Sequence, residues 1–181
     1  TFIAAISTAP YYSVRLNKRK NQDEATCLTG TTSAVAWCEN AYYIDQRPKY
    51  TLNPLFHAGC FYPQEASSMY VAHVMNHIAD LLPEDPVVLD LCAAPGGKST
   101  LLASRLDGRG VLVANEAVRS RAWILRENIV KWGYDNCIVT NCDPKQIGEA
   151  GAMYDVMLID APCSGEGMFR KDNTAVEEWN I

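Results

Sequence analysis

The chain has 181 residues, of which 48% are hydrophobic and 20% are charged, and its formal net charge is −5. This length fits one ordinary domain, or one domain and part of another, and the composition predicts a globular protein with a packed core. The sequence contains no apolar run near the roughly 18 residues that a membrane-spanning helix requires. We interpret the opening stretch TFIAAISTAP as part of the fold, because it lacks the positive flank of a secretion signal.

The charge is distributed unevenly along the chain. Residues 1–50 carry six Lys and Arg against four Asp and Glu, whereas residues 51–181 carry ten against seventeen. A negative net charge does not favour nucleic-acid binding, but a local basic patch can bind a phosphate backbone. The net charge therefore does not exclude RNA as a partner.

Cysteine usage indicates a reducing compartment. The number of cysteines is odd and the sequence has no C-x-x-C pair, which favours free thiols over a disulfide framework or a zinc ribbon. The seven are Cys27, Cys38, Cys60, Cys92, Cys137, Cys142 and Cys163. We therefore expect a cytoplasmic protein without a metal site.

Residues 1–53 predict a small α+β module. Strands are expected at 11–16, 34–37 and 41–44, and the basic residues at 17–20 fit either a solvated turn or a phosphate contact. The linker is expected at 47–54, because its prolines interrupt both helices and strand pairing.

Residues 54–181 predict a second domain that opens with a helix over 66–82. The expected apolar face consists of Val71, Val74, Met75, Ile78 and Leu82. His73 and His77 lie on the other face. We interpret that face as solvated rather than as a zinc site, because the internal Glu of an H-E-x-x-H motif is missing.

An alternation of strands and helices follows this helix. Strands separated by helices or long connections predict a parallel sheet with right-handed crossovers, which is a Rossmann-like α/β fold. The first expected strand begins at residue 87, and three more are expected at 111–115, 137–140 and 155–159. The expected helices span 99–106 and 118–132.

The stretch VVLDLCAAPGGKST at 87–100 reads as a buried strand, a small-residue loop and the start of a helix. In open α/β sheets, ligands bind beyond the carboxyl ends of the strands. A Walker A loop would need Gly where Cys92 stands, and a dinucleotide fingerprint needs more than the adjacent Gly96 and Gly97. The remaining ligand class is S-adenosylmethionine, the cofactor of methyltransferases.

Acidic residues follow the next three strands. Glu116 stands about 20 residues past the first loop, where an acid accepts ribose hydroxyls in dinucleotide folds. Asp143 is placed to accept from an adenine amino group, and Asp160 ends the last strand. Each acid alone is also explained as a helix cap or turn residue, Asp143 followed by Pro144 in particular.

The dipeptide Pro162-Cys163 beside a methyl donor indicates pyrimidine chemistry. A thiolate that adds to carbon 6 of cytosine makes carbon 5 nucleophilic, so carbon 5 can attack a methyl sulfonium. Asp160 is placed to bond the ring nitrogen or the exocyclic amine. The alternative is that Cys163 is a structural cysteine in a turn.

Two motifs, DLCAAPGGKST at 90–100 and DAPCSGEGMFRKD at 160–172, resemble the cofactor and proline-cysteine motifs of the Nop/Sun family of RNA cytosine-5 methyltransferases. SVRLNKRK at 13–20 and PLFHAGCFYPQEASSM at 54–69 are similar to preceding family segments, particularly in the bacterial 16S ribosomal RNA branch. The resemblance implies an RNA substrate, an RNA-recognition-like module at the N-terminus, and catalytic roles for Asp160 and Cys163. The cofactor-binding residues that it implies are Cys92, Ala93, Ala94, Pro95, Gly96, Gly97, Lys98, Glu116, Asp143 and Asp160.

One departure from the family pattern affects the expected activity. The resemblance implies that the cysteine adding to the base belongs to a later Thr-Cys motif, and that Cys163 assists product release. That motif would lie beyond Ile181, and Thr26-Cys27 lies in another domain. We therefore expect a fragment that binds cofactor and turns over poorly. The alternatives are Cys163 as nucleophile, a non-catalytic cofactor- or RNA-binding module, and a P-loop-like nucleotide binder.

Overall fold

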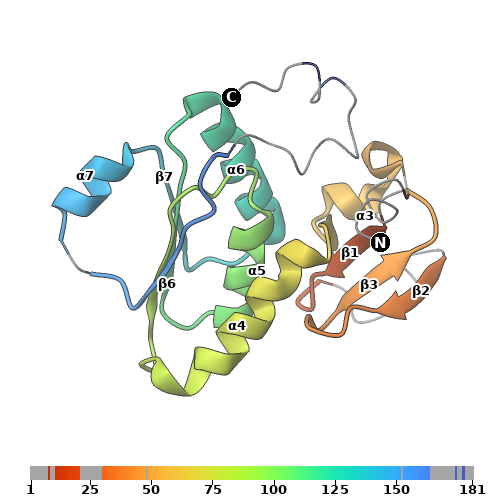
Figure 1. Cartoon of the computed structure of the whole chain (residues 1–181), viewed down its shortest axis with the longest axis horizontal. Helices are drawn as coiled ribbons and strands as arrows, with labels where there is room; N and C mark the ends of the chain where they lie inside the picture. The colour runs from red at the N-terminus through yellow and green to blue at the C-terminus, as the bar shows by residue number, and fades with distance from the viewer. Residues whose placement is uncertain are drawn as a thin grey trace.

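The computed structural model describes residues 8, 11–20, 30–47, 49–151, 153–163, 174 and 177. It contains a small antiparallel sheet built from the N-terminal residues and a parallel sheet built from the later ones. Three helices, α4, α5 and α6, lie between the two sheets, and α7 lies on the far side of the parallel sheet (Figure 1). Within the described part of the chain, no helix has the length and apolar character that crossing a membrane would require.

The N-terminal sheet has the order β2-β3-β1-β4 with antiparallel pairing. Its strands are β1 (Tyr12–Leu16), β2 (Thr31–Ala34), β3 (Ala41–Ile44) and β4 (Phe61–Pro63). The predictions for β1 and β3 are confirmed to within one residue, but the strand predicted at 34–37 is wrong. There the backbone turns, with the Cys38 N–H donating to the Val35 carbonyl at 3.1 Å. Both side chains are buried, so the apolar run reflects a buried turn rather than a strand.

The segment predicted as a linker contains short helical turns. These are η1 (Tyr50–Leu52) and α3 (Pro54–His57), and the Asn53 side chain caps α3 by accepting from the Leu55 N–H at 2.9 Å. β4 follows α3 and pairs with β1, so the N-terminal sheet extends past the predicted boundary at residue 53. The division into 1–53 and 54–181 stays a prediction.

The helix predicted over 66–82 is present as three consecutive pieces. They are η2 (Ser67–Tyr70), α4 (Val71–Ile78) and η3 (Ala79–Leu81). In α4, Ala72 and Met75 are buried. Val74, which was predicted to lie on the buried apolar face, is 46% exposed. The reason is that α4 packs against two groups of residues, with Met75 in the core of the parallel sheet and Ala72 facing the N-terminal module. The histidines are exposed as predicted.

The parallel sheet has the order β7-β6-β5-β8. Its elements are β5 (Val87–Asp90), α5 (Gly97–Leu106), β6 (Val111–Asn115), α6 (Arg119–Trp132), β7 (Cys137–Thr140), α7 (Pro144–Glu149) and β8 (Val156–Leu158). The Rossmann-like prediction is confirmed, and only α7 was not anticipated. The chain runs from β5 to β7 in one direction and then returns to place β8 on the other side of β5. This reversal opens a crevice at the carboxyl end of β5, where such folds bind ligands.

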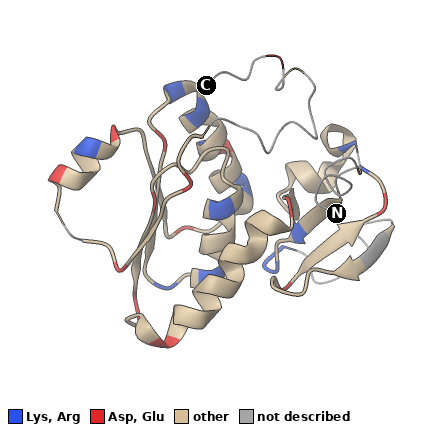
Figure 2. Cartoon of the chain, in the orientation of Figure 1, with Lys and Arg blue, Asp and Glu red and all other residues tan. Residues whose placement is uncertain are grey.

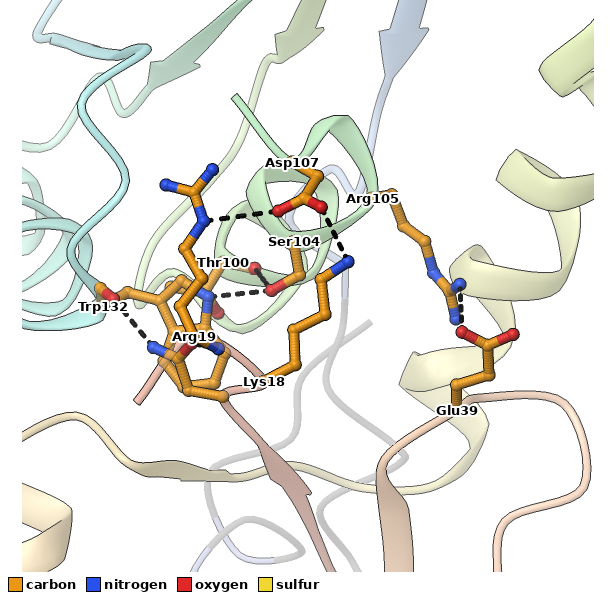
Figure 3. Close-up of polar contacts among 9 residues, drawn as sticks. Lys18, Arg19, Glu39, Thr100, Ser104, Arg105, Asp107 and Trp132 are labelled. Carbon is orange, nitrogen blue, oxygen red and sulfur yellow. Dashed lines mark hydrogen bonds and ion pairs between the residues drawn. The ribbon is translucent and has the colours of Figure 1, made fainter. Parts of the chain in front are cut away.

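The basic turn after β1 packs against the helices of the parallel sheet. Lys18 and Arg19 both contact Asp107 at the end of α5, at 2.9 and 3.3 Å, and Arg105 contacts Glu39 of the N-terminal module at 3.2 Å (Figure 3). Such exposed ion pairs contribute less than about 1 kcal/mol each. The fully buried Asn17 contributes more specificity, since its amide donates to the carbonyls of Gly59 and Trp132. The turn thus joins the two sheets.

Candidate active site

The loop between β5 and α5 is held in place by α6. Gly96 has a φ of 111°, and a Cβ there would lie 3.3 Å from the Leu125 side chain, so the position requires glycine. The Asn128 amide donates to the Pro95 carbonyl at 2.8 Å, and Arg121 donates to the Ala94 carbonyl at 2.9 Å. The loop therefore has a fixed shape before any ligand arrives.

A cavity of about 210 Å³ lies beside this loop. One wall contains predicted cofactor-binding residues, and another comes from β4 and the segment that follows it. The lining residues are Tyr62, Pro63, Gln64, Glu65, Ser68, Asp90, Cys92, Ala93, Ala94, Pro95, Gly97, Lys98 and Asp160. The structure thus brings together the two motif loops, at 90–100 and 160–163, which are far apart in the sequence. The wall from the N-terminal module was not predicted.

Charged side chains of both motifs meet in the cavity. The Lys98 Nζ lies 2.5 Å from an Asp160 carboxylate oxygen. Asp90 is buried at the end of β5 and accepts a hydrogen bond from the Ser99 hydroxyl at 2.6 Å. Burial raises the pKa of Asp90 to about 6, and the Ser99 hydrogen bond only partly offsets this rise. Lys98 and Ser99 are thus each bonded to a carboxylate, of Asp160 and Asp90 respectively.

Glu116 lies next to this cavity but does not line it. It is 4% exposed at the end of β6, and one carboxylate oxygen accepts from the Val118 N–H at 2.9 Å. The other oxygen lies 3.6 Å from Arg121, which also holds the Ala94 carbonyl of the loop. Glu116 is therefore linked to the loop through a shared arginine.

Asp143 has a structural role. Its side chain accepts from the Lys145 N–H at 2.8 Å, and its own N–H donates to the Gln146 side chain, which forms a capping box at the start of α7. It is exposed and does not line the cavity. The helix-cap alternative left open by the sequence is therefore what the structure shows, and cofactor binding by Asp143 stays a prediction.

Asn115 joins three strand ends and was missed in the sequence. Its side chain is fully buried, and its amide donates to the carbonyls of Leu91 and Cys142, both at 3.1 Å. Its oxygen accepts from the Thr140 hydroxyl at 2.8 Å and from the Cys142 N–H at 3.0 Å. The only signal in the sequence was an amide at the last position of an otherwise apolar strand. Such a residue is rarely buried without partners.

The two cysteines of the predicted site differ in their surroundings. Cys92 is half-buried, and burial raises the pKa of its thiol, with further contributions from Glu116, Asp90 and Asp160. It therefore stays protonated at neutral pH and is a poor nucleophile. Cys163 is exposed and follows Asp160 by three residues. The part of its motif from residue 164 to residue 172 lies outside the described residues.

A parallel sheet with a glycine-rich loop after its first strand and acids after the others defines the class of Rossmann-like methyltransferases. Structural comparison agrees, because a methyltransferase homolog from Pyrococcus horikoshii superimposes with a TM-score of 0.77 at 29% identity, covering 96% of this chain and 57% of that one. The crystal structure of NSun6 from Pyrococcus horikoshii with SFG has a TM-score of 0.71 over 90% of this chain and 66% of its own. At 20% identity it supports the fold alone.

The family is given by the sequence comparisons. The model described as 16S rRNA methyltransferase RsmB/F matches residues 78–178, and the N-terminal domain of 16S rRNA methyltransferase RsmF matches residues 1–66. The chain therefore belongs to the RsmB/F family of 16S rRNA methyltransferases, and the resemblance seen in the sequence is confirmed.

Two individual relatives that match this chain share one name. Ribosomal RNA small subunit methyltransferase F of Pectobacterium carotovorum is 38% identical over 189 residues, which cover 99% of this chain and 38% of the relative. The protein of that name from Vibrio cholerae is 39% identical over 194 residues, covering 99% of this chain and 39% of the relative. The chain thus spans less than half the length of the curated relatives it matches.

Proposed function

We propose that this chain forms the cofactor-binding part of an enzyme that transfers a methyl group from S-adenosylmethionine to carbon 5 of a cytosine in small-subunit ribosomal RNA. The observation that carries the proposal is that the two family motifs line one cavity and meet through the ion pair of Lys98 and Asp160. Membership of the family supports the substrate class.

The residues present fit this cofactor. The amino-terminal end of α5 and Lys98 favour a carboxylate, while the carboxylates of Asp90 and Asp160 favour an ammonium and a sulfonium. The proposed role of Glu116 is to accept hydrogen bonds from the ribose hydroxyls, and that of Asp143 is to accept from the adenine amino group. When bound, the cofactor supplies an electrophilic methyl group.

The chemistry at the base needs a thiolate and an acid. A thiolate adds to carbon 6, carbon 5 gains the methyl group, a base removes the proton from carbon 5, and the thiol leaves. We assign hydrogen bonding of the base to Asp160 and assistance of thiol release to Cys163, with the attacking cysteine in a later segment. Cys163 as the attacking thiol is the alternative.

An RNA partner is compatible with local charge. Helix α6 carries Arg119, Arg121, Arg126 and Lys131 against a single Glu127. Figure 2 colours the Lys and Arg residues of the chain blue. The N-terminal module would extend such a surface as an RNA-recognition-like domain. Binding would weaken as salt is raised, since phosphate contacts release counterions.

Calorimetric titration tests the cofactor assignment. We expect the chain to bind S-adenosylmethionine selectively in the micromolar range, with ATP–magnesium and NAD as controls. A folded chain, judged by circular dichroism, that binds none of the three would refute the assignment. Preference for ATP–magnesium would instead support a nucleotide-binding protein.

The role of Cys163 is tested in the complete enzyme. We expect Cys163→Ala to accumulate a covalent adduct between protein and RNA, because release is impaired while addition by the other cysteine continues. A denaturing gel detects the adduct. Loss of methylation without any adduct would show that Cys163 is the attacking thiol, and undiminished methylation without adduct would remove it from the reaction.

A further inference from the structure

Gln64 is a buried side chain with an unused hydrogen-bond donor at the candidate cofactor site. It follows β4, and its backbone is fixed by two hydrogen bonds with Ser13, one from the Gln64 N–H at 3.2 Å and one from the Ser13 hydroxyl at 2.6 Å. The residue is 8% exposed and lines the cavity. Among the residues that the structure describes, none accepts a hydrogen bond from its Nε2.

The orientation of the Gln64 amide is set by Arg15. The Arg15 Nε donates to the Gln64 Oε1 at 3.1 Å. A guanidinium has donors only, so it must face the oxygen of the amide rather than the nitrogen. The amino group of Gln64 therefore points away from Arg15. It lies beside Gly97, since a Cβ on Gly97 would be 3.6 Å from Nε2.

Arg15 itself is held rigidly between the two sheets. Its guanidinium donates to the Gly97 carbonyl at 3.1 Å and to the Thr100 hydroxyl at 2.7 Å, and it stacks 4.6 Å from the centre of the Trp132 ring. Burial lowers its pKa to about 10, so it stays protonated at neutral pH. The described residues provide no carboxylate partner within ion-pair distance. Arg15 thus acts as a fixed support for both Gln64 and the first turn of α5.

The donor of Gln64 meets a second feature that favours an anion. Helix α5 begins at Gly97 and has ten residues, and the first N–H groups of a helix lack intrahelical partners. These groups, together with the helix dipole, attract a carboxylate. Gln64 and Gly97, the first residue of α5, both line the cavity, and the buried Gln64 amino group lies beside Gly97.

We propose that Gln64 is a cofactor-binding residue whose amide donates to the carboxylate of the amino acid moiety, and that Arg15 is the positioning residue that orients it. Gln64 is contributed by the N-terminal module, which in the structure extends past residue 53 through β4. This inference rests on the proposed function. It explains why a wall of the cavity is built from residues that precede the methyltransferase fold. A methyltransferase domain without this module would hold the cofactor less tightly.

Two ligands that differ only in the amino acid moiety test the inference. S-adenosylhomocysteine carries the carboxylate, and 5′-methylthioadenosine keeps the nucleoside and sulfur without it. We expect Gln64→Met and Gln64→Glu to weaken S-adenosylhomocysteine binding by about tenfold or more, as expected for a lost hydrogen bond to a charged group. Binding of methylthioadenosine should stay within twofold of wild type. Gln46→Met, at an exposed turn away from the cavity, is the matched control and should change neither affinity.

Each outcome separates the two proposals. An equal loss for both ligands, or no loss for either in a folded variant, would overturn the role of Gln64 and leave the cofactor assignment intact. A wild-type chain that binds neither ligand would overturn both. For Arg15→Lys, we expect the affinity for S-adenosylhomocysteine to fall relative to the affinity for methylthioadenosine. A purely structural role of Arg15 would lower both affinities together. If that variant fails to fold, the Gln64 variants still decide the question.

Discussion

Asn115 offers a sharp test of how the ends of the parallel strands are held together. Its amide donates to two buried carbonyls, of Leu91 and Cys142, and its oxygen accepts from Thr140 and from the Cys142 N–H. The substitution Asn115→Asp keeps the shape and both accepting contacts. It replaces the two donors by an oxygen that faces two carbonyl oxygens.

The expected cost follows from the groups left unpaired. A buried polar group without a partner costs about 1–3 kcal/mol, and partial relaxation makes the costs less than additive. We expect Asn115→Asp to lower the free energy of unfolding by about 3 kcal/mol at neutral pH, a large share of the roughly 5–15 kcal/mol of a typical domain. Thr140→Val removes only one of the four hydrogen bonds and should cost about 1 kcal/mol.

Urea denaturation followed by circular dichroism measures both variants. The cost of Asn115→Asp should shrink as pH falls. Burial against carbonyl oxygens raises the pKa of the new carboxyl above its unfolded value of about 3.9, and its protonated form donates again. A loss under about 1 kcal/mol at neutral pH, or a loss no larger than that of Thr140→Val, would refute the reasoning.

Three further measurements address the cavity and its rim. The pKa of Asp90 is raised from 3.8 to about 6, so its contribution to stability is present below pH 4 and is lost as pH rises through 6. The contribution that is lost amounts to about 3 kcal/mol. Asp90→Asn should therefore remove this part of the pH dependence of stability, measured by denaturation at several pH values. An unchanged slope in Asp90→Asn would contradict this origin. Lys98→Met should change the free energy of unfolding by less than about 1 kcal/mol, because Asp160 in the pair is 59% exposed, yet weaken S-adenosylmethionine binding about tenfold in calorimetry. Equal affinity would exclude Lys98 from the site. Asp143→Ala should cost about 1 kcal/mol of stability as a lost cap and weaken cofactor binding by about 1–3 kcal/mol, whereas Asp143→Ser should restore the cap alone. Unimpaired binding by the Ala variant would leave Asp143 as a cap only.

The order of elements in the parallel sheet could be read from the sequence because the signals are local. Strands β6 and β7 match their predicted ranges, since short apolar runs flanked by helical segments have few other solutions. The strands of the N-terminal module were harder to predict from the sequence. The turn at 35–38 is as apolar as a strand, because its buried residues pack against η2, α4 and α5. Nothing in the residue pattern distinguishes a buried turn from a buried strand.

The sequence by itself determined the class of fold, the family and the glycine-rich loop after β5, because glycine spacing, strand periodicity and the Pro-Cys motif are properties of neighbouring residues. Only the tertiary structure decided which distant residues share the cavity. Gln64 lines it, and Arg15 supports Gln64 from behind, because β1 and β4 pair in the N-terminal sheet and dock on α5. The role of Asn115 was likewise decided by partners far away in the sequence, the carbonyls of Leu91 and Cys142. The physical reason is that a buried polar side chain must find its partners in three dimensions, and local sequence does not specify them.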